Sequence, residues 1–414
     1  MTVTGGGGPF RAAVTGLGMV TAAGPDTRSS WEGILAGRPT AAEAPELAGL
    51  PVSFACRADA FDGEAVLGRR QSWRLDRTTQ LATAATAEAL AQAGLDPAEW
   101  DGARVGVVLG TALGGVTTWQ READRLRELG PDSVSPLLIP MSAVNMTAGQ
   151  LAAAHGARGP NFATATACAS GTTALGAARD LLRSNTCDIV VAGGTEAAIS
   201  PLVAAAFAKM GALSKRSDDP AGASRPFDRH RDGFVLAEGA AVLVLERPEH
   251  AAARGAVPYA YLSGYGASAD AGHATRPDPE GRGAESALRA ALADAGLGPD
   301  DVDHVNAHGT STPLNDAVES AMIRRVLGAR HPAVTSVKGV TGHCLGASGA
   351  IEAAVAVLSL HHQLVPPTAN LTEIDAGMEV DVVADKARPL PMSTVVSHSF
   401  GFGGQNAVVT LTSA

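Results

Sequence analysis

One cysteine stands in a setting that could make its thiol a nucleophile. Cys168 lies within Asn161–Gly171, where small residues flank it just before an alanine-rich segment. We expect a turn from a strand into a helix here, so that amides of the helix N-terminus favour the thiolate and lower the pKa of the thiol. The same amides could hold a substrate oxyanion. The alternative is a buried cysteine that packs as a small hydrophobic residue, which is our interpretation of Cys56, Cys187 and Cys344.

Two histidines occupy glycine-rich turns of a similar kind. His308 lies in Asn306–Pro313, after a predicted strand, and His343 lies in Lys338–Gly349, ahead of a long predicted helix. Imidazoles in such turns can project into a cleft as hydrogen-bond donors or bases. The alternative is a capping or structural role. No carboxylate or further histidine has a ligand-like spacing from either residue, so we predict no metal site.

Alternating strands and helices must position these side chains. Short apolar runs predict strands and alanine-rich runs predict helices, the pattern of an α/β fold. The predicted strands are Ala12–Thr15, Val105–Leu109, Asp188–Ala192, Ala240–Leu245, Asp303–Asn306 and Ala407–Thr412. The predicted helices are Thr79–Ala93, Ser170–Arg183, Ala284–Ala295, Asp316–Leu327 and Ala347–His361.

A repeated segment indicates that the fold is duplicated. Ala89–Pro97 reappears with few changes as Ala291–Pro299. Each copy is typical of a helix end closed by glycine, followed by a proline turn and an apolar strand that leads into Gly-Thr. Because the strand and turn match as well, we favour duplication over chance. The predicted halves are residues 1–257, which carry the cysteine, and 258–414, which carry the two histidines.

Composition excludes several classes of protein. The 414-residue chain has 32 Lys and Arg against 42 Asp and Glu, a net charge of -10, and 4% aromatic residues, so we predict no nucleic-acid binding. Its 4 cysteines include no Cys-x-x-Cys pair, which argues against a disulfide framework or a zinc site. It has no membrane-length apolar run and no signal-peptide pattern at its start, so we expect a soluble, cytoplasmic protein without a membrane partner.

Taken together, these motifs resemble a known family, the elongating β-ketoacyl-acyl carrier protein synthases (type II ketosynthases). The resemblance runs from Arg11 to the end of the chain, with the motifs in the family's order and spacing. It rests on Val14–Met19, Thr166–Gly171, Ser224–Arg229, Asp232–Phe234, Asn306–Thr312, Lys338–His343 and Ser399–Gly404. It implies a thiolase-like α/β fold of two duplicated βαβ-rich halves in five layers, α-β-α-β-α.

The resemblance implies roles for the residues of the three turns. Cys168 would accept an acyl chain as a thioester. His308 and His343 would stabilise the enolate that forms when a malonyl group on a carrier protein loses carbon dioxide. Lys338 would orient the site electrostatically, with a solvated surface lysine as the alternative. Glu352 would support the site from behind, with an ordinary helix carboxylate as the alternative.

Substrate binding would involve further positions of the family pattern. The Phe400 ring would gate the acyl pocket, with its glycine neighbours giving hinge freedom, and the Phe400 and Cys168 amides would hold the thioester oxyanion. Thr310 and Thr312 would bind the pantetheine arm. Pocket-lining positions, for which an ordinary core role is the alternative, are Leu113, Gly114, Gly115, Phe207 and Phe402.

The expected partner is an acyl carrier protein bearing acyl and malonyl groups. Carrier proteins are acidic, and so is this chain, so docking requires a local basic cluster. The densest clusters are Arg69, Arg70, Arg74 and Arg77, followed by Lys215 and Arg216. A solvated helix face is the alternative for the first cluster. We expect a homodimer, or a heterodimer with a related ketosynthase-like subunit.

Two other functions stay open. A non-catalytic chain-length factor would lack the nucleophilic cysteine, which this chain has. A degradative thiolase acting on coenzyme A thioesters would carry a second cysteine as base, where this chain has Ser399-Phe400-Gly401. Fatty-acid and polyketide pathways are not separated by these motifs. We expect no cofactor, because the third glycine of Gly16/Gly18/Gly24 is displaced from the dinucleotide fingerprint.

Overall fold

The computed structural model describes residues 9–328 and 330–414. The start of the chain, where we expect no signal peptide, falls largely outside the described residues. The main sheet has 11 strands in the order β12-β10-β9-β14-β15-β8-β1-β7-β6-β4-β5. Its strands are β1 (Ala12–Val20), β4 (Val105–Gly110), β5 (Asn161–Thr164), β6 (Ile189–Ala197), β7 (Glu238–Glu246), β8 (Ala260–Ala269), β9 (His304–Asn306), β10 (Ala333–Thr335), β12 (Asp381–Val382), β14 (Thr394–Gly401) and β15 (Gln405–Ser413).

The strand order repeats itself. The first half runs β1-β7-β6-β4-β5, and the second runs β8-β15-β14-β9-β10 in the same sequence of connections, with β12 added at its edge. The two halves meet where Ala12–Val14 of β1 pair antiparallel with β8. The duplication predicted from the repeated segment is therefore present in the topology. The proposed boundary at residues 257 and 258 stays a prediction.

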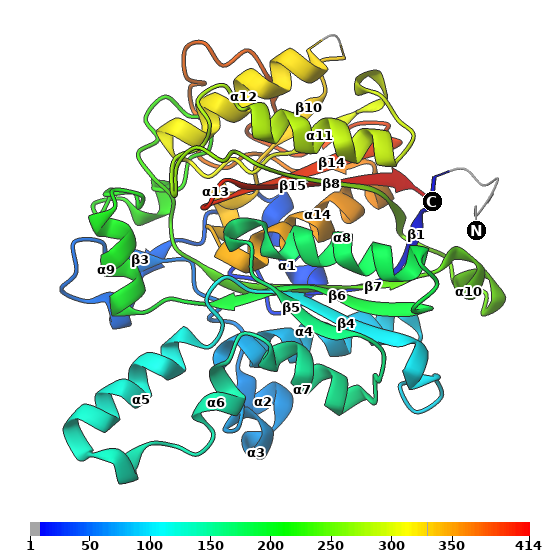
Figure 1. The fold of residues 1–414 in the computed structure, drawn as a ribbon. Coiled ribbons are helices and arrows are strands. Elements are labelled where there is room, and N and C mark those ends of the chain that lie inside the picture. Colours follow the sequence, from blue (N-terminus) through cyan, green and yellow to red (C-terminus); the bar gives the residue numbers. More distant parts are fainter. Residues whose placement is uncertain (1–8, 329) are drawn as a thin grey trace.

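Five layers result from this arrangement (Figure 1). α4 (Arg77–Ala93) and α7 (Met146–His155) cover the outer face of the first half-sheet. α11 (Arg282–Asp294) and α12 (Pro313–Leu327) cover the outer face of the second. Between the half-sheets lie α8 (Ser170–Arg183) and α14 (Ser348–His362), which contact each other. The predicted thiolase-like α-β-α-β-α fold is confirmed.

The repeated segments have a shared packing role. A Cβ added at Gly16 of β1 would lie 2.1 Å from the Ala89 carbonyl oxygen of α4. A Cβ added at Gly264 of β8 would lie 2.1 Å from the Ala291 carbonyl oxygen of α11. In each half, therefore, a glycine in the first strand lets the helix backbone approach the sheet, at the residue where the repeated segment begins.

Shorter elements surround the layers. Additional helices are α1 (Thr27–Leu35), α2 (Gly63–Leu67), α3 (Arg69–Ser72), α5 (Val116–Leu129), α6 (Leu138–Ser142), α9 (Pro201–Lys209), α10 (Pro248–Ala253) and α13 (Lys338–Thr341). Two small sheets pair β2 (Ala42–Glu43) with β3 (Phe54–Ala55) and β11 (Leu364–Val365) with β13 (Arg388–Pro389). Within the described ranges, every helix is too short or too polar to cross a membrane.

Each predicted strand and helix is present, with different ends in some cases. The strand predicted as Asp188–Ala192 is β6, which continues to Ala197. The prediction stopped early because Gly193-Gly194 resembles a turn. In the structure these glycines stay in the ladder beside β7, where a Cβ on Gly193 would lie 2.0 Å from the Ala241 carbonyl oxygen. Gly193 is therefore required because the neighbouring strand leaves no room for a side chain.

Candidate active site

Cys168 lies where the chain turns from β5 into α8. A short 3₁₀ turn, Ala167–Ala169, begins with a left-handed residue, Ala167 at φ 49°, and α8 starts at Ser170. The predicted strand-to-helix turn is therefore correct. The predicted lowering of the thiol pKa is wrong for this state, because burial raises the pKa of Cys168 to about 11, although Lys338 and the Phe402 amide lower it. Removal from water outweighs these two attractions.

His308 follows β9 and is fixed by a carboxylate on α12. The amides of His308 and Gly309 each donate to Glu319, at 2.8 Å. Gly309 has φ 37°, and a Cβ there would lie 2.5 Å from Ser336, so glycine is required at this close turn. Glu319 also contacts His398 of β14 at 3.0 Å. A buried carboxylate thus joins three segments behind the imidazole.

His343 comes from the loop between α13 and α14. Its backbone pairs with the segment before β7: its amide donates to Val235 at 2.8 Å, and its carbonyl accepts from Ala237 at 3.1 Å. The Phe234 ring packs edge-on against the imidazole at 5.1 Å between centroids. Nδ1 lies 2.9 Å from the Ser348 hydroxyl at the start of α14. These contacts leave Nε2 as the free ring nitrogen.

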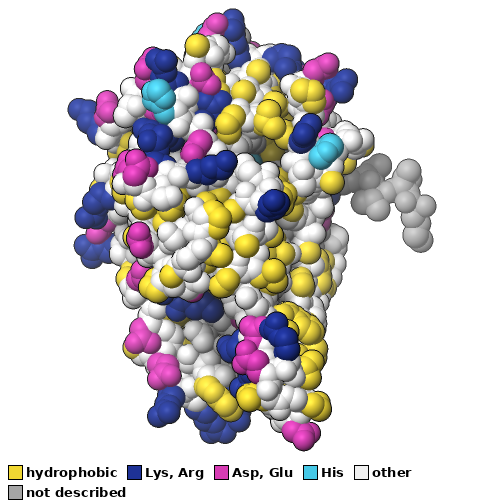
Figure 2. Space-filling model, turned by 90° about the vertical axis from the view of Figure 1, so that its left-hand side faces the viewer, with side chains coloured by type: hydrophobic (Ala, Val, Ile, Leu, Met, Phe, Trp, Pro, Cys, Tyr) yellow, Lys and Arg dark blue, Asp and Glu magenta, His cyan; other side chains and the backbone are white. Residues whose placement is uncertain are grey.

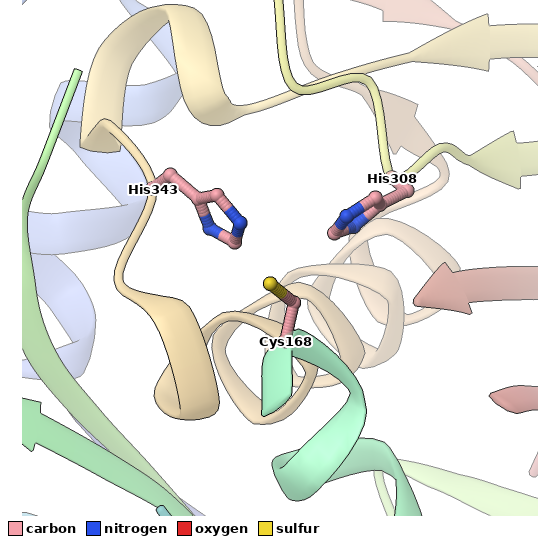
Figure 3. A group of neighbouring side chains, drawn as sticks. All are labelled: Cys168, His308 and His343. Carbon is pink, nitrogen blue, oxygen red and sulfur yellow. The ribbon is translucent and has the colours of Figure 1, made fainter. Parts of the chain in front are cut away.

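The three side chains converge, as Figure 3 shows. The Cys168 sulfur and one ring nitrogen from each of His308 and His343 lie within 4.8 Å of one another. The two imidazoles stand at 82°, with centroids 5.4 Å apart. A thiol and two imidazoles are also ligand types for zinc, so among the described residues this trio is the group that could hold such an ion. The sequence had not predicted this possibility, because the three residues are far apart along the chain.

A buried ion pair lies behind His308. Lys338 is 1% exposed and donates to the Glu352 carboxylate. Its Nζ donates to the His308 carbonyl oxygen, at 2.5 Å. Its Nζ also lies 3.3 Å from His308 Nδ1. An ammonium has no acceptor, so Nδ1 accepts and the ring proton is on Nε2. This burial excludes the solvated lysine as an alternative. The buried pairing with Lys338 argues against an ordinary helix carboxylate at Glu352, whose pKa burial raises to about 7.

Both active-site imidazoles are neutral near pH 7. Burial, followed by the neighbouring Lys338 charge, lowers the pKa of His308 and of His343 well below the ordinary value. A neutral imidazole with its proton on Nε2 donates a hydrogen bond without carrying charge. For His308 the Lys338 contact fixes this tautomer.

Phe400 lies next to the last residue of β14, at the hairpin into β15. It pairs with Asn406 across the hairpin, and its ring lies 5.9 Å from the His308 ring. Gly403 and Gly404 adopt φ of 83° and 70°, which glycine tolerates best. Asn406 donates to Asp270, at 2.7 Å, which ties the hairpin to the loop after β8. The loop partner Asp270 was not predicted from the sequence.

A cavity of about 760 Å³ opens above the trio. It is bordered by all three reactive side chains and by most of the predicted substrate-binding residues. These are Leu113, Phe207, Thr310, Thr312, Phe400 and Phe402. Gly114 does not border it, because its backbone faces Ser142 and Val144 instead. The Thr310 and Thr312 hydroxyls lie 2.9 Å apart at its wall.

The predicted arginine cluster divides into two environments. Arg69, Arg70 and Arg74 are exposed and border a separate groove of about 680 Å³ between α3, α6 and α7. Arg77 is not part of this surface, because it pairs with Glu238 at 2.9 Å. The second candidate is also partly engaged, since Lys215 and Arg216 lie in the loop bound to Asp232 and His230. Figure 2 shows acidic and basic side chains interspersed over one face.

A duplicated five-layer fold with a buried cysteine between two neutral histidines defines a thiolase-fold condensing enzyme. The family models for the N-terminal and C-terminal domains of β-ketoacyl synthase match residues 10–251 and 259–372. The chain belongs to the β-ketoacyl synthase family.

Named relatives agree with this assignment. The chain is 40% identical to 3-oxoacyl-[acyl-carrier-protein] synthase 2 of Coxiella burnetii, covering 97% of this chain and 98% of the relative. It is 43% identical to the protein of the same name from Synechocystis sp., covering 96% and 97%.

Solved structures match at similar coverage. A ketosynthase complex described as a type II PKS acyl-carrier protein with its ketosynthase bound to the hexaketide matches with a TM-score of 0.91 and 31% identity, covering 98% of this chain and 100% of that one. The ishigamide ketosynthase/chain length factor matches with a TM-score of 0.92 and 31% identity, again over 98% and 100%.

Proposed function

We propose that this chain catalyses decarboxylative Claisen condensation between an acyl group on Cys168 and a malonyl group on an acyl carrier protein. One observation carries the proposal: the Cys168 sulfur lies within 4.8 Å of a nitrogen of each of two neutral imidazoles at a cavity of about 760 Å³. A nucleophile and two uncharged donors around one carbonyl-sized space suit acyl transfer and enolate stabilisation.

In the first half-reaction the acyl chain moves to the enzyme. The Cys168 sulfur attacks the acyl thioester carbonyl, a new carbon–sulfur bond forms, and the bond to the pantetheine sulfur breaks. The thiol proton leaves with the released pantetheine thiol, so charge balances. The amide beside the thiol is that of Phe402 rather than the expected Phe400, so we assign the oxyanion of the tetrahedral intermediate to the amides of Cys168 and Phe402. Lys338 stabilises the developing thiolate, consistent with its lowering of the Cys168 pKa.

In the second half-reaction malonyl-carrier protein replaces the spent carrier. The carbon–carbon bond to the carboxylate breaks, carbon dioxide leaves, and the electron pair forms an enolate whose oxygen accepts from His308 Nε2 and His343 Nε2. His343 Nε2 donates in the tautomer in which Nδ1 accepts from the Ser348 hydroxyl, 2.9 Å away. The enolate carbon attacks the acyl-Cys168 carbonyl and expels the thiolate, which takes a proton from solvent.

Two alternatives from the sequence are less well supported. A chain-length factor needs no nucleophile, whereas Cys168 here lies between two imidazoles with a buried lysine behind them. A thiolase needs a second cysteine at the reacting carbon. Among the described residues that border the cavity, Cys168 is the one cysteine.

The test follows the acyl group by mass. The purified chain is incubated with acyl-carrier protein, then with malonyl-carrier protein. We expect an acyl mass increase confined to the Cys168 peptide, then its loss with release of carbon dioxide and a β-ketoacyl product. No acylation of Cys168 would support a chain-length factor. Condensation with acetyl-coenzyme A but not malonyl thioester would support a thiolase.

For the carrier protein, we propose docking on the groove lined by Arg69, Arg70 and Arg74. These arginines make no ion pair within the described part of the chain, so their charge is available to an acidic partner. Trp73 between them is 73% exposed, and an exposed tryptophan beside arginines is typical of protein interfaces. The relative complex of a ketosynthase with its carrier protein supports this kind of partner.

For assembly, we propose a dimer formed through edge strand β5. Within residues 9–328 and 330–414, β5 pairs with β4 alone, which leaves its other edge open. Exposed apolar side chains on β5, α5 and α6 include Phe162, Trp119, Leu126 and Ile139, which are 37 to 55% exposed. Large apolar side chains exposed at a sheet edge favour a subunit interface. Sedimentation of the chain alone, and with a coexpressed homologue, distinguishes homodimer from heterodimer.

Cytoplasmic location and the choice between fatty-acid and polyketide pathways stay predictions.

A further inference from the structure

The turn that carries the nucleophile has a counterpart in the second half of the chain. Ala167-Cys168-Ala169-Ser170-Gly171 corresponds to Leu345-Gly346-Ala347-Ser348-Gly349. Each segment is a 3₁₀ turn that opens with a left-handed residue, at φ 49° and 45°, and leads into a central helix, α8 or α14. Gly346 therefore occupies the position that Cys168 has in the first half.

The Glu196 side chain fills the site around this counterpart. Glu196 lies near the end of β6 and is 0% exposed. Its Oε2 accepts from the amides of Gly346 at 3.1 Å and Ala112 at 2.6 Å. Its Oε1 accepts from the Thr111 hydroxyl at 3.0 Å and the Leu113 amide at 3.2 Å. The Gly346 amide therefore donates to the Glu196 carboxylate. In the first half, the equivalent amide of Cys168 would donate to a substrate oxyanion.

Two of the four donors, and a neighbour of a third, belong to the wall of the acyl cavity. Ala112, Leu113 and Leu345 border the cavity, whereas Glu196 does not. Gly346 lies two residues before Ser348, which contacts His343. Glu196 is the shared acceptor that joins the Thr111–Leu113 segment to the turn ahead of α14. Burial raises the pKa of Glu196 to about 7, while its four donors lower it.

We propose that Glu196 is a positioning residue that clamps the Thr111–Leu113 wall to the Leu345–Ala347 turn and thereby sets which acyl chains the cavity accepts. The proposal rests on the proposed function, because it concerns the acyl group carried by Cys168. A carboxylate is required at this position because only a side chain with two acceptor oxygens can accept all four hydrogen bonds. Four donors converge on its two oxygens, and an amide would place an N–H group against donors, which would force the two segments apart.

The test uses Glu196→Gln together with Thr111→Val, which keeps the side-chain shape and removes one donor to Glu196 as well as the acceptor of the Gly114 amide. Acylation of Cys168 is timed with acyl-carrier proteins of graded chain length, and product lengths are determined by mass. We expect the KM for long acyl donors to rise about tenfold in Glu196→Gln, the scale of one lost hydrogen bond to a charged group. Thr111→Val should change KM in the same direction by less, and kcat should fall less than kcat/KM in both.

A matched control is Glu246→Gln, a buried carboxylate on β7 that pairs with Arg254 away from the cavity. It should lower stability and leave chain-length preference unchanged. Unaltered KM and product lengths in both test variants would overturn the proposal. So would a loss that is equal at every chain length and matched by Glu246→Gln. If the unaltered enzyme is never acylated on Cys168, the proposed function itself has failed.

Discussion

At the scale of single residues, the site is organised by removal of water. Burial raises the pKa of the Cys168 thiol and lowers the pKa of both histidines, so all three groups are neutral at rest. The Lys338 cation lowers the pKa of the Cys168 thiol, against the effect of burial. It also lowers the pKa of both histidines, in the same direction as burial. Neutral imidazoles fit the enolate half-reaction, because a charged imidazolium would have to be dehydrated before the site could close.

The first prediction separates the two half-reactions. Cys168→Gln should stop condensation and keep decarboxylation of malonyl-carrier protein. The Gln amide oxygen can take the place of the acyl-Cys168 carbonyl at the Phe402 amide, which lies beside the thiol, so the site resembles its acylated form. Release of carbon dioxide with acetyl-carrier protein as the product is the measurement.

The comparison for this prediction is His343→Ala. It removes a donor aimed at the enolate, and decarboxylation should fall by about 10²–10³-fold. If Cys168→Gln abolishes both activities while His343→Ala spares both, the division of labour is wrong.

At the scale of elements, glycine and polar residues decided which strands the sequence could predict. β8 (Ala260–Ala269) was missed because Gly264 and Gly266 resemble a loop, although they are the residues that admit α11. β14 was missed because Ser397, His398 and Ser399 interrupt its apolar pattern. Each of these departures from strand propensity is explained by a close contact or by the site, and such contacts cannot be read from local composition.

The central helices supply the second prediction. A Cβ at Gly349 of α14 would lie 2.1 Å from the Thr172 hydroxyl of α8, which bonds Ser399 at 2.7 Å. Gly349→Ala should therefore destabilise the fold by about 1–3 kcal/mol through overpacking. Denaturant unfolding measures this change. The control is Gly149→Ala on α7, where a new Cβ meets nothing within 4 Å, and stability should rise by about 0.5–1 kcal/mol. Equal changes in unfolding free energy for the two variants would refute the claim that Gly349 is required where α14 packs against α8.

Helix α3 supplies the third prediction. Reversing Arg69 and Arg70 together to Glu should raise the KM for acyl-carrier protein by about tenfold or more, because like charges across an interface repel. The KM for a small acyl thioester should not change. Arg289→Glu on α11, at the opposite end of the molecule from α3 (Figure 1), is the control. Steady-state kinetics with both substrates measures these changes. An unchanged KM for acyl-carrier protein would exclude this surface as the docking site.

At the scale of the whole molecule, duplication explains what sequence could and could not predict. Cys168 and both histidines could be singled out because each lies in a turn of small residues beside a regular element. Glu319 and Glu196 were not, because each is a carboxylate within an ordinary helix or strand. Their roles depend on which segments the duplicated fold brings together: the His308 turn with α12 for Glu319, and the Thr111–Leu113 segment with the turn ahead of α14 for Glu196.

The last prediction concerns acid stability. His304 is fully buried in β9, both of its ring nitrogens lack a partner among the described residues, and burial lowers its pKa to about 3. Below the ordinary pKa of 6.5 the unfolded chain takes up a proton that the folded chain refuses. Stability is therefore lost as pH falls from 6.5 toward 3, and His304 accounts for about 2 kcal/mol of that loss at pH 5.

His304→Leu should remove this share of the acid loss and add stability at pH 7.5, because two unpartnered polar atoms disappear. Unfolding free energies at pH 7.5 and pH 5 measure both effects. His361→Leu, at an exposed position in the last turn of α14, controls for the change of side chain. The buried His308 and His343 continue to act in the variant, so its acid sensitivity should shrink without vanishing. A variant that loses as much stability between the two pH values as the unaltered chain would show that His304 can be protonated within the fold, through an opening of the sheet at β9.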